Sequence, residues 1–575
     1  MKKYIILIIA LTLSSYSQNI LDNGRLSGNF QLDGQYIMKD NAIGVVDTLE
    51  KIRSNSFLNL NYSASNFSFG LRYEGYFNRM LGYDNQYNGS GIPYRFATYN
   101  SEQIDITVGN FYEQFGSGMI YRSYQDWALG IDNSTDGARF KYRPASGLQI
   151  LGLIGKQRYY WDKSPGIIRG ADISIDLNEF SSLFSGKTEN SDSSHTASSA
   201  DSDSWRVNLG FSALGKFQTD DQSYYNLPQN VASLSGRASV MASNFSIETE
   251  YAYKSQDPNK TNLYNFNTGN AFLTNLSYFT EGFSLTLGAH RTDNMDYRSA
   301  RVVTGNMLTI NFIPPATKQQ IYRLATVYPF ATQLNGELGS QLDITYKFSE
   351  NSFLGGQHGT TVNFNCSILK GLDTSVIKTD TINKEIRTVT YKSPFFGISK
   401  KLFYEDLNLE LSHKWNDDWK STFFYSLQLY DRDVMEEQGK RTIGLVHSHI
   451  AVADIEYKIN ETNSIRTELQ HLWSNQTLTS GLDSSDTKNG NWALLLMEYT
   501  ISPHWFISFF DEYNYGNHFA EKQLHYYNGL IAYTFGTTRF MCGYGRQRAG
   551  KLCVGGVCRD VPAMNGLTLT ISSSF

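Results

Sequence analysis

The sequence predicts an all-β fold, a transmembrane antiparallel β-barrel of about 24 strands, within bounds of roughly 22 and 26. Three observations lead to this prediction. The chain ends in an alternating strand that stops on an aromatic residue, apolar and polar residues alternate in many other segments, and long and short connections follow each other in turn. We expect short periplasmic turns, long extracellular loops and no plug domain.

The last ten residues, 566–575, have the pattern of a barrel-closing strand. Leu567, Leu569, Ile571 and Phe575 fall on one face of an extended strand, and small hydroxyl side chains fall on the other. A terminal aromatic residue in such a strand resembles the signal that the barrel-insertion machinery reads. We therefore expect Phe575 to be a C-terminal insertion signal.

The N-terminus has the pattern of a cleaved secretory signal. The chain begins with Met-Lys-Lys, an apolar run follows over residues 4–13, and small residues precede Gln18. No cysteine follows the cleavage point, so we expect no lipoprotein anchor. The predicted organisation is a signal peptide over 1–17 and one barrel domain over 18–575, located in the cell outer membrane. No apolar run after Gln18 is long enough for a membrane-spanning helix.

The composition fits a barrel better than a soluble protein of several domains. Aromatic residues make up 14% of the 575 residues and proline occurs only 11 times, as expected for strands with aromatic girdles. A mean hydropathy of -0.38 suits strands with one face in a wet lumen. The net charge of -5 argues against a nucleic-acid partner.

Alternation with a period of two residues recurs in five further segments. Their apolar faces carry Leu26, Phe30, Leu32, Tyr36 and Met38; Phe67, Phe69, Leu71, Tyr73 and Phe77; Trp205, Val207, Leu209 and Phe211; Phe423, Tyr425, Leu427 and Leu429; and Ile465, Leu469 and Trp473. The opposite faces are polar and include Arg72 and Glu74. This pattern alone fits both the core of a soluble sandwich and the lipid-facing band of a barrel.

Connection lengths distinguish the two folds. Long connections are expected at 39–53, 79–93, 431–446, 474–490, 515–522 and 546–565, and short ones at 64–66, 100–103, 416–418, 459–463, 501–504 and 535–538. Outer-membrane barrels place short turns in the periplasm and long loops outside, whereas sandwiches have no such asymmetry. Both termini are periplasmic by this rule.

Two segments depart from the regular scheme. The Ser/Asp-rich segment 181–204 is long although it falls on the periplasmic side, and its low complexity predicts disorder. The segment 291–334 contains Pro314 and Pro315 and is either one folded loop or a concealed extra hairpin. The first strand begins near Arg25, so we expect no N-terminal plug or periplasmic repeats, which disfavours a TonB-dependent transporter or an insertase.

The chain is also expected to carry no peptidoglycan-binding domain after its last strand. A barrel of this width is not filled by the side chains of its own strands. Its lumen is therefore expected to be open, or occupied by loops that fold inward.

Two stretches carry a family resemblance. One is Gly-Asn-Phe-Tyr-Glu-Gln-Phe-Gly-Ser-Gly at 109–118, which runs into 129–137, and the other is 544–558. They resemble an uncharacterised family of large, porin-like outer-membrane barrels found in Bacteroidota. A glutamine such as Gln18 at the start of the mature chain is also typical of exported proteins from that bacterial group. The resemblance implies location and fold over the mature chain, and no activity. The run at 109–118 is also similar to a strand and loop of porins.

The first candidate site is the glycine-rich loop 111–136. Its charged residues, with one just beyond, are Glu113, Arg122, Asp126, Asp132, Asp136 and Arg139. Folded into the lumen, facing acidic and basic side chains would form a constriction with a transverse field, and aromatic residues such as Tyr112 and Trp127 would pack the loop against the wall. The alternative is a surface loop with solvated charges.

The second candidate site lies within 291–328. Its charged residues are Arg291, Asp293, Asp296, Arg298, Arg301 and Arg323. The length of this segment and a helix-like stretch at 316–325 would suit an internal gate or cap. The alternative, which we prefer on the sequence, is an extracellular excursion held by its own aromatic residues.

Cys553 and Cys558 lie in a glycine-rich stretch and are expected to form a local disulfide; a metal site is the less favoured interpretation because no histidine is near. The basic residues around them are Arg546, Arg548, Lys551 and Arg559. This positive loop would contact surface polysaccharide, lipopolysaccharide phosphate or a protein partner, or else form a rigid loop that resists proteases.

His447, His449 and His471 are the remaining candidates for a metal or hydrolase site. His449 and His471 share faces with apolar residues, so an interfacial girdle is the better interpretation. We expect no catalytic residues, no cofactor and no metal, and hence no enzyme.

The sequence thus predicts a porin-like channel for hydrophilic solutes. The alternative is a structural or accessory barrel that binds a surface or secretion-system partner through its extracellular loops. The expected partners are outer-membrane lipid and lipopolysaccharide, the barrel-insertion machinery during assembly, and a surface or secretion partner.

Overall fold

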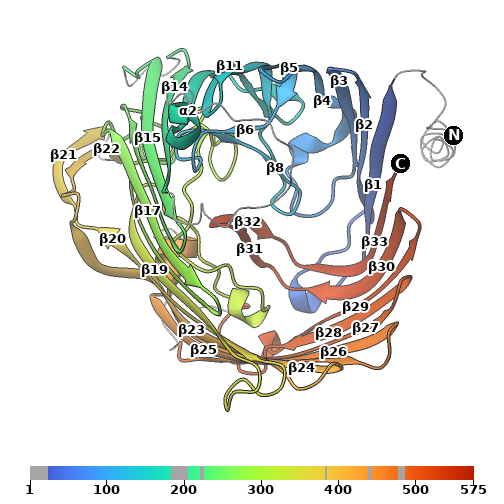
Figure 1. Cartoon of the computed structure of the whole chain (residues 1–575). Helices are drawn as coiled ribbons and strands as arrows, with labels where there is room; N and C mark the ends of the chain where they lie inside the picture. Colours follow the sequence, from blue (N-terminus) through green and yellow to red (C-terminus); the bar gives the residue numbers. More distant parts are fainter. Residues whose placement is uncertain (1–23, 183–204, 221–225, 383–384, 438–442, 477–485) are drawn as a thin grey trace, which may run out of the picture.

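The computed structural model describes residues 24–182, 205–220, 226–382, 385–437, 443–476 and 486–575. The predicted signal peptide and nearly all of the segment 181–204 lie outside these residues. Within them, the chain forms one closed ring of antiparallel strands with almost no helix (Figure 1). None of the described helices has the length and apolar character that crossing a membrane requires.

The main sheet contains 25 described strands, and all except the two-residue β12 (Asp162–Lys163) form the ring. The 24 ring strands are β1 (Arg25–Ile37), β2 (Ile52–Ala64), β3 (Phe67–Phe77), β4 (Gly89–Asn100), β5 (Ile104–Phe111), β10 (Thr135–Ala145), β11 (Leu148–Tyr159), β13 (Ile167–Asp176), β14 (Arg206–Phe217), β15 (Asn230–Ala242), β16 (Phe245–Lys254), β17 (Gly269–Thr280), β18 (Phe283–Asp293), β19 (Gly336–Phe348), β20 (Thr360–Leu372), β23 (Ile398–Lys414), β24 (Trp419–Asp431), β25 (Leu445–Lys458), β26 (Asn463–Ser474), β27 (Trp492–Ile501), β28 (Trp505–Tyr513), β29 (His525–Phe535), β30 (Thr538–Gln547) and β33 (Met564–Ser574). The predicted fold class and strand number are confirmed.

The connections carry short elements of their own. They are the strands β6 (Glu113–Gln114), β7 (Arg122–Ser123), β8 (Gln125–Asp126), β9 (Ile131–Asp132), β21 (Ser375–Ile382), β22 (Glu385–Lys392), β31 (Gly550–Val554) and β32 (Val557–Val561), the helix α2 (Leu177–Ser182), the 3-10 turns η1 (Asn41–Ile43), η2 (Asn85–Tyr87), η3 (Leu324–Thr326) and η5 (Ala520–Lys522), and the π-helical turn η4 (Asp433–Glu437).

The barrel closes where the last strand meets the first. β33 pairs with β30 on one side and with β1 on the other, so Leu32 lies opposite Ile571. The backbone N–H of Phe575 donates to the carbonyl of Gly28 (3.0 Å), and the N–H of Gly28 donates to the carbonyl of Phe575 (2.9 Å). The ring of Phe575 lies where a side chain at position 28 would be, which explains the glycine. The signal role of Phe575 stays a prediction.

Alternate side chains of each strand point out of the ring and into it. In β24, Phe423 and Tyr425 are 47% and 44% exposed, whereas Phe424 and Ser426, which alternate with them, are 3% and 0% exposed. His449 of β25 lies on the outer face, where its Nδ1 is 2.8 Å from the hydroxyl of Tyr425. A closed barrel with an apolar outer belt is the architecture of an outer-membrane protein, because lipid cannot satisfy an open sheet edge.

One end of the ring has short turns and the other has long loops, as the alternation of connection lengths predicts. Exceptions at the short end are the connection 349–359 between β19 and β20 and the segment that begins with α2. At the long end we name five loops: L2 (78–88), L3 (112–134), L7 (294–335), L8 (373–397) and L12 (548–563).

L3 and L7 fold into the lumen. Phe115, Ile120 and Tyr121 of L3 are fully buried in one apolar cluster with inward residues of β11–β17. Tyr322 and Tyr328 of L7 are buried in a second cluster with inward residues of β20–β29. Figure 1 shows β6, β8 and the β31–β32 hairpin inside the ring. The structure therefore places L7 inside the barrel rather than on the extracellular excursion that we preferred on the sequence.

The segment 291–334 adds no further pair of ring strands, and its described path between β18 and β19 is a single loop with one antiparallel bridge, between Arg298 and Thr309. The helix expected at 316–325 is absent as well, because the only helical turn there is η3, which begins at Leu324. The side chains of this stretch bond individually to the wall instead. Lys318 donates to Asn363 (2.6 Å) and Gln320 to Asp406 (2.5 Å).

Arginine substitutions on the outer face of β28 test its exposure to lipid. Phe509 and Trp505 are 45% and 42% exposed on the same face, one in mid-strand and the other at the short-turn end. Phe509→Arg should lower the free energy of unfolding in phospholipid vesicles by about 2–4 kcal/mol, and Trp505→Arg by about 0–1 kcal/mol. Guanidinium titrations would measure both losses. Equal losses would mean that this face does not cross hydrocarbon.

Candidate functional site: the loop-filled lumen

The tip of L3 docks halfway down the inner wall. Phe115 is fully buried there, and the backbone N–H of Ser117 donates to the carboxylate of Glu250 in mid-β16 (2.8 Å). Gly116 between them has φ +52, and an added Cβ would collide with the same carboxylate. Glycine is therefore needed for the tip to turn this close to the wall.

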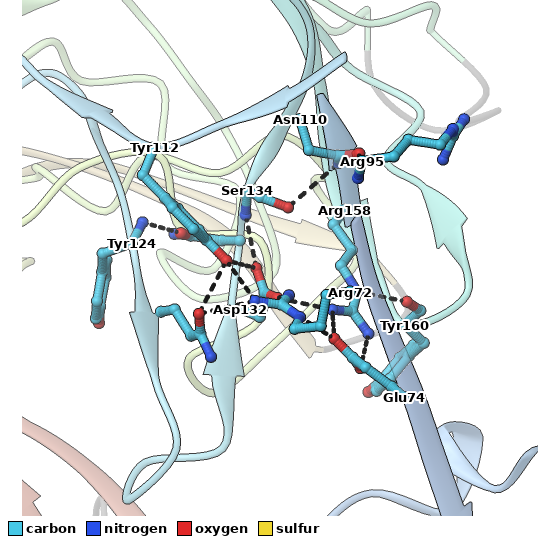
Figure 2. Close-up of polar contacts among 12 residues, drawn as sticks. Arg72, Glu74, Arg95, Asn110, Tyr112, Tyr124, Asp132, Ser134, Arg158 and Tyr160 are labelled. Carbon is cyan, nitrogen blue, oxygen red and sulfur yellow. Dashed lines mark hydrogen bonds and ion pairs between the residues drawn. The ribbon is translucent and has the colours of Figure 1, made fainter. Parts of the chain in front are cut away.

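Four buried charges bind the far part of L3 to the barrel (Figure 2). Arg72 and Glu74 come from β3, Arg158 from β11 and Asp132 from β9 within L3. Arg158 pairs with Asp132 (2.7 Å) and with Glu74 (2.7 Å), Arg72 pairs with Glu74 (2.6 Å), and Arg72 also pairs with Asp132. These side chains are at most 3% exposed. Tyr112 donates its hydroxyl to the remaining oxygen of Asp132 (3.0 Å).

The charge balance of this cluster determines its electrostatics. Burial acts to raise the pKa of Asp132, but the positive charges of Arg158 and Arg72 outweigh it and hold that pKa below the ordinary value. Two guanidinium groups and two carboxylates leave no net charge in the site. The cluster specifies where L3 attaches, since a buried ion pair adds little net stability while loss of one partner is costly.

The other end of L3 has a second ionic contact. Glu113 pairs with Arg139 (3.1 Å) and with Lys141 (2.7 Å), both on the inner face of β10, and Arg139 also pairs with Asp105 of β5 (2.9 Å). Glu113 and Arg139 are therefore brought together, as a constriction requires. Their partners Asp105 and Lys141 lay outside our sequence prediction.

The remaining predicted residues of L3 lie apart from each other. The guanidinium of Arg122 stacks on the ring of Phe312 of L7 (4.1 Å), and Asp126 accepts a backbone N–H within L3. Asp136 takes the outward register of β10 and pairs with Lys163 (2.8 Å). The six predicted charges thus do not form one row across the lumen. Most of them fix the loop in place.

Sequence reasoning missed Arg72, Glu74 and Arg158 as site residues. Arg72 and Glu74 had been assigned to the polar face of their strand, and Arg158 lies at the loop end of β11. The available signal was a charge on the polar, inward face of a strand, in mid-strand for Arg72 and towards the loop end for Glu74 and Arg158. Such a charge faces the lumen rather than lipid, so a neighbouring loop can supply its ion-pair partner.

The charged residues at the start of L7 are buried and paired locally. Arg291 pairs with Asp293 (3.0 Å) on the wall, and Arg298 makes two bonds to Asp296 (2.7 and 2.9 Å). Arg301 donates to three backbone carbonyls of the loop between β14 and β15. The bonds of Arg301 attach the beginning of L7 to a neighbouring loop, whereas the other two pairs lie within β18 and within L7.

The middle of L7 descends through the barrel. Arg323 pairs with Glu512 on the inner face of β28 (2.7 Å). The partner of Lys318 is Asn363, which lies only three residues from the short-turn end of β20. L7 therefore reaches from the long-loop end almost to the opposite end of the lumen.

L12 contributes a third inward element, the β31–β32 hairpin. The structure joins Cys553 and Cys558 in a disulfide across this hairpin. At its tip, the carbonyl of Gly556 accepts the N–H of Thr332 of L7 (3.0 Å), and the N–H of Gly555 donates to Gln319 (3.0 Å). Gly556 has φ +77 and its would-be Cβ overlaps the side chain of Thr332, so only glycine fits this docked tip.

The basic residues at the end of β30 and in L12 have different environments. Arg546 pairs with Asp40 (2.7 Å), Arg548 with Glu512, and Lys551 with Asp560 (2.9 Å). Arg559 has no ion pair among the described residues. It lines a cavity of about 700 Å³ between L2, L3, L7 and L12.

One sector of the inner wall remains accessible to solvent at mid-height. Asn29 of β1 is exposed, and Gln31, Asp33, Asn59 of β2 and Thr570 of β33 are part-exposed. All five point inward, and several bond to each other, as Asn59 does to Asn29 (2.7 Å) and Thr570 to Asp33 (2.8 Å). This sector follows the seam where the barrel closes.

Several inward polar residues at the middle of the other strands are covered. Ser212 of β14, Asn365 of β20 and Ser426 of β24 are fully buried, and Glu250 of β16 and Gln470 of β26 are 4% exposed. The loops therefore cover much of the lumen wall and leave the β33–β1–β2 sector uncovered, while Gln341 of β19 and Ser508 of β28 are part-exposed as well.

Neutralising one carboxylate of the four-charge cluster tests the attachment of L3. Asp132→Asn leaves Arg72 and Arg158 with Glu74 alone, which should cost about 3–5 kcal/mol. Trypsin should then cleave after Arg122 about a hundredfold or more faster in vesicle-reconstituted protein. Asp162→Asn, at an exposed turn, is the matched control and should leave the rate unchanged. Equal rates for the two variants would refute the anchoring role of this cluster.

The sequence matches, over residues 1–575, the model of a family described as "Family of unknown function (DUF6029)". No curated protein matches it. Among solved structures, it is similar to the siderophore receptor PirA from Pseudomonas aeruginosa (8% identity, TM-score 0.39, 96% of this chain and 80% of that chain), the P pilus usher PapC translocation pore (8%, 0.39, 96% and 99%) and OccK5 (OpdH) from Pseudomonas aeruginosa (10%, 0.31, 84% and 98%). The bacterial group implied by the sequence resemblance stays a prediction. The chain is an outer-membrane β-barrel and belongs to the DUF6029 family.

Proposed function

We propose that this protein is a narrow channel that carries small hydrophilic solutes across the outer membrane. The observation that supports it is the uncovered polar sector of β33, β1 and β2 at mid-height, in a lumen whose other walls are largely covered by loops. Hydroxyl, amide and carboxylate groups there offer hydrogen bonds to a hydrated solute and no large apolar surface.

The ion-paired loops account for selectivity in this proposal. L3 and L7 are fixed to the wall by buried charges and apolar clusters, so the free cross-section is much smaller than the ring of 24 strands alone would allow. The solute passes beside the loops, along the closing seam. We propose no catalytic step in this passage.

A second candidate function rests on L8. The β21–β22 hairpin lies outside the ring in Figure 1. At its base, Phe395 packs on the outward ring of Phe272 (centroids 6.1 Å apart), and Phe396 is 85% exposed. An exposed apolar projection of this kind favours an accessory barrel that binds a surface or secretion partner. Co-purification of a partner in fixed ratio, together with no conductance, would favour it over the channel.

Cysteine modification tests the proposed route. In a background of Cys366→Ala and Cys542→Ala, Gln31→Cys places a thiol on the uncovered sector, and Ser426→Cys places one on the covered wall as its control. A negatively charged methanethiosulfonate should modify Gln31→Cys and roughly halve its single-channel conductance in planar bilayers. It should leave the Ser426→Cys variant unmodified by mass and unchanged in conductance.

Two outcomes would contradict the channel proposal. One is the absence of single-channel steps from folded, inserted protein. The other is equal modification of the two thiols, or modification of Gln31→Cys with no effect on conductance, because either result would separate the uncovered sector from the path of the solute.

A further inference from the structure

The cavity of about 700 Å³ at the long-loop end has the size of a binding site for a small organic molecule. Its walls combine the rings of Tyr83, Tyr124 and Phe312 with the side-chain amides of Asn306 and Asn311. These residues come from L2, L3 and L7, and the β31–β32 hairpin forms a further wall. Aromatic faces beside amide groups suit a solute with both polar and apolar surfaces.

Arg559 of β32 is a cation held in this cavity without a counter-ion. Its guanidinium lies over the ring of Tyr83, 5.3 Å from the centroid. Its Nη1 lies 3.3 Å from the position that a Cβ at Gly130 would take, so a glycine there allows the close approach. Nε and Nη1 are buried and have no hydrogen-bond acceptor among the described residues.

The carboxylates of the cavity do not neutralise Arg559. Asp296 is engaged by both sides of the Arg298 guanidinium, and Asp560 pairs with Lys551 (2.9 Å). Asp84 is exposed and accepts a backbone N–H of its own loop (2.9 Å). The exposed Lys260 also lines the cavity and adds a second positive charge without a described ion pair.

The electrostatics of Arg559 also indicate a positive charge that lacks a paired anion. Burial lowers its pKa, and Tyr83 and the more distant Asp126 only partly oppose this effect. A guanidinium remains protonated under all physiological conditions. The free energy of the protein therefore includes a desolvation penalty for this positive charge. A bound anion would reduce that penalty.

We propose that this cavity binds an organic anion, whose carboxylate or phosphate group pairs with Arg559 and whose body packs against Tyr83, Tyr124 and Phe312. The inference deepens the proposed function, on which it rests, by naming the class of solute that the channel selects. Arginine forms charge-assisted hydrogen bonds with both acidic groups. Lys260 supplies long-range attraction to either of them.

The experiment is calorimetric titration of the purified, detergent-solubilised barrel at low salt with three probes: gluconate, glucose 6-phosphate and glucose. They share a six-carbon polyol body and differ in carrying a carboxylate, a phosphate or no charge. At least one acid should bind about tenfold or more tightly than glucose. Binding of gluconate alone assigns the site to carboxylates, binding of glucose 6-phosphate alone assigns it to phosphates, and binding of both assigns it to either.

Variants connect this binding to Arg559. Arg559→Gln should weaken binding of the acid about tenfold or more, and Arg559→Lys should retain part of it because the charge remains. The matched control is Lys51→Gln, which removes one positive charge from an exposed position of the same end. It should leave the affinity unchanged.

Two results would overturn the anion site: neither acid binding better than glucose, or Arg559→Gln binding as tightly as the parent protein. The readout needs no conductance, so it separates the two proposals. Silent bilayers with acid binding intact would refute the channel alone, whereas conducting bilayers without acid preference would refute the anion site alone.

Discussion

The rest of the structure depends on one constraint: in hydrocarbon, every backbone N–H and C=O must be paired within the protein. The chain meets it by closing 24 antiparallel strands into a ring, with β33 hydrogen-bonded to β1 at the seam. Outward apolar rings follow from this closure, because the outer face then meets only lipid. The width of the ring follows from its 24 strands, and a ring this wide leaves a lumen that its own strand side chains cannot fill.

L3, L7 and L12 occupy that lumen, and their attachments differ in kind. L3 is held by a neutral set of four buried charges around Asp132, L7 by Arg323 with Glu512 and by apolar packing, and L12 by backbone bonds at Gly556. The buried ion pairs among them contribute more to position than to stability. Because the loops cover the wall unevenly, the polar sector near Gln31 stays accessible to solvent. One cationic cavity also remains around Arg559.

The sequence predicted the barrel well because its signals are local. A period of two along a strand and the length of the next connection are both visible within about twenty residues. The contacts that fix each loop, in contrast, join residues that are far apart in the sequence. Asp132 meets Arg72, which lies 60 residues earlier, and Lys318 meets Asn363 on a wall that exists only after the ring has closed. The helix expected at 316–325 failed for the same reason, since contacts to the wall replaced those along the chain.

Photo-crosslinking from L7 in intact outer membranes tests the central claim, that the chain's own loops fill the barrel. Tyr322 lies against Phe424 on the inner face of β24, with ring centroids 5.0 Å apart. With benzoylphenylalanine in place of Tyr322, illumination should join L7 to the peptide of β24, as identified by mass spectrometry. Crosslinks to other molecules at the cell surface, with none to β24, would show that L7 lies outside and that the lumen is not filled as described.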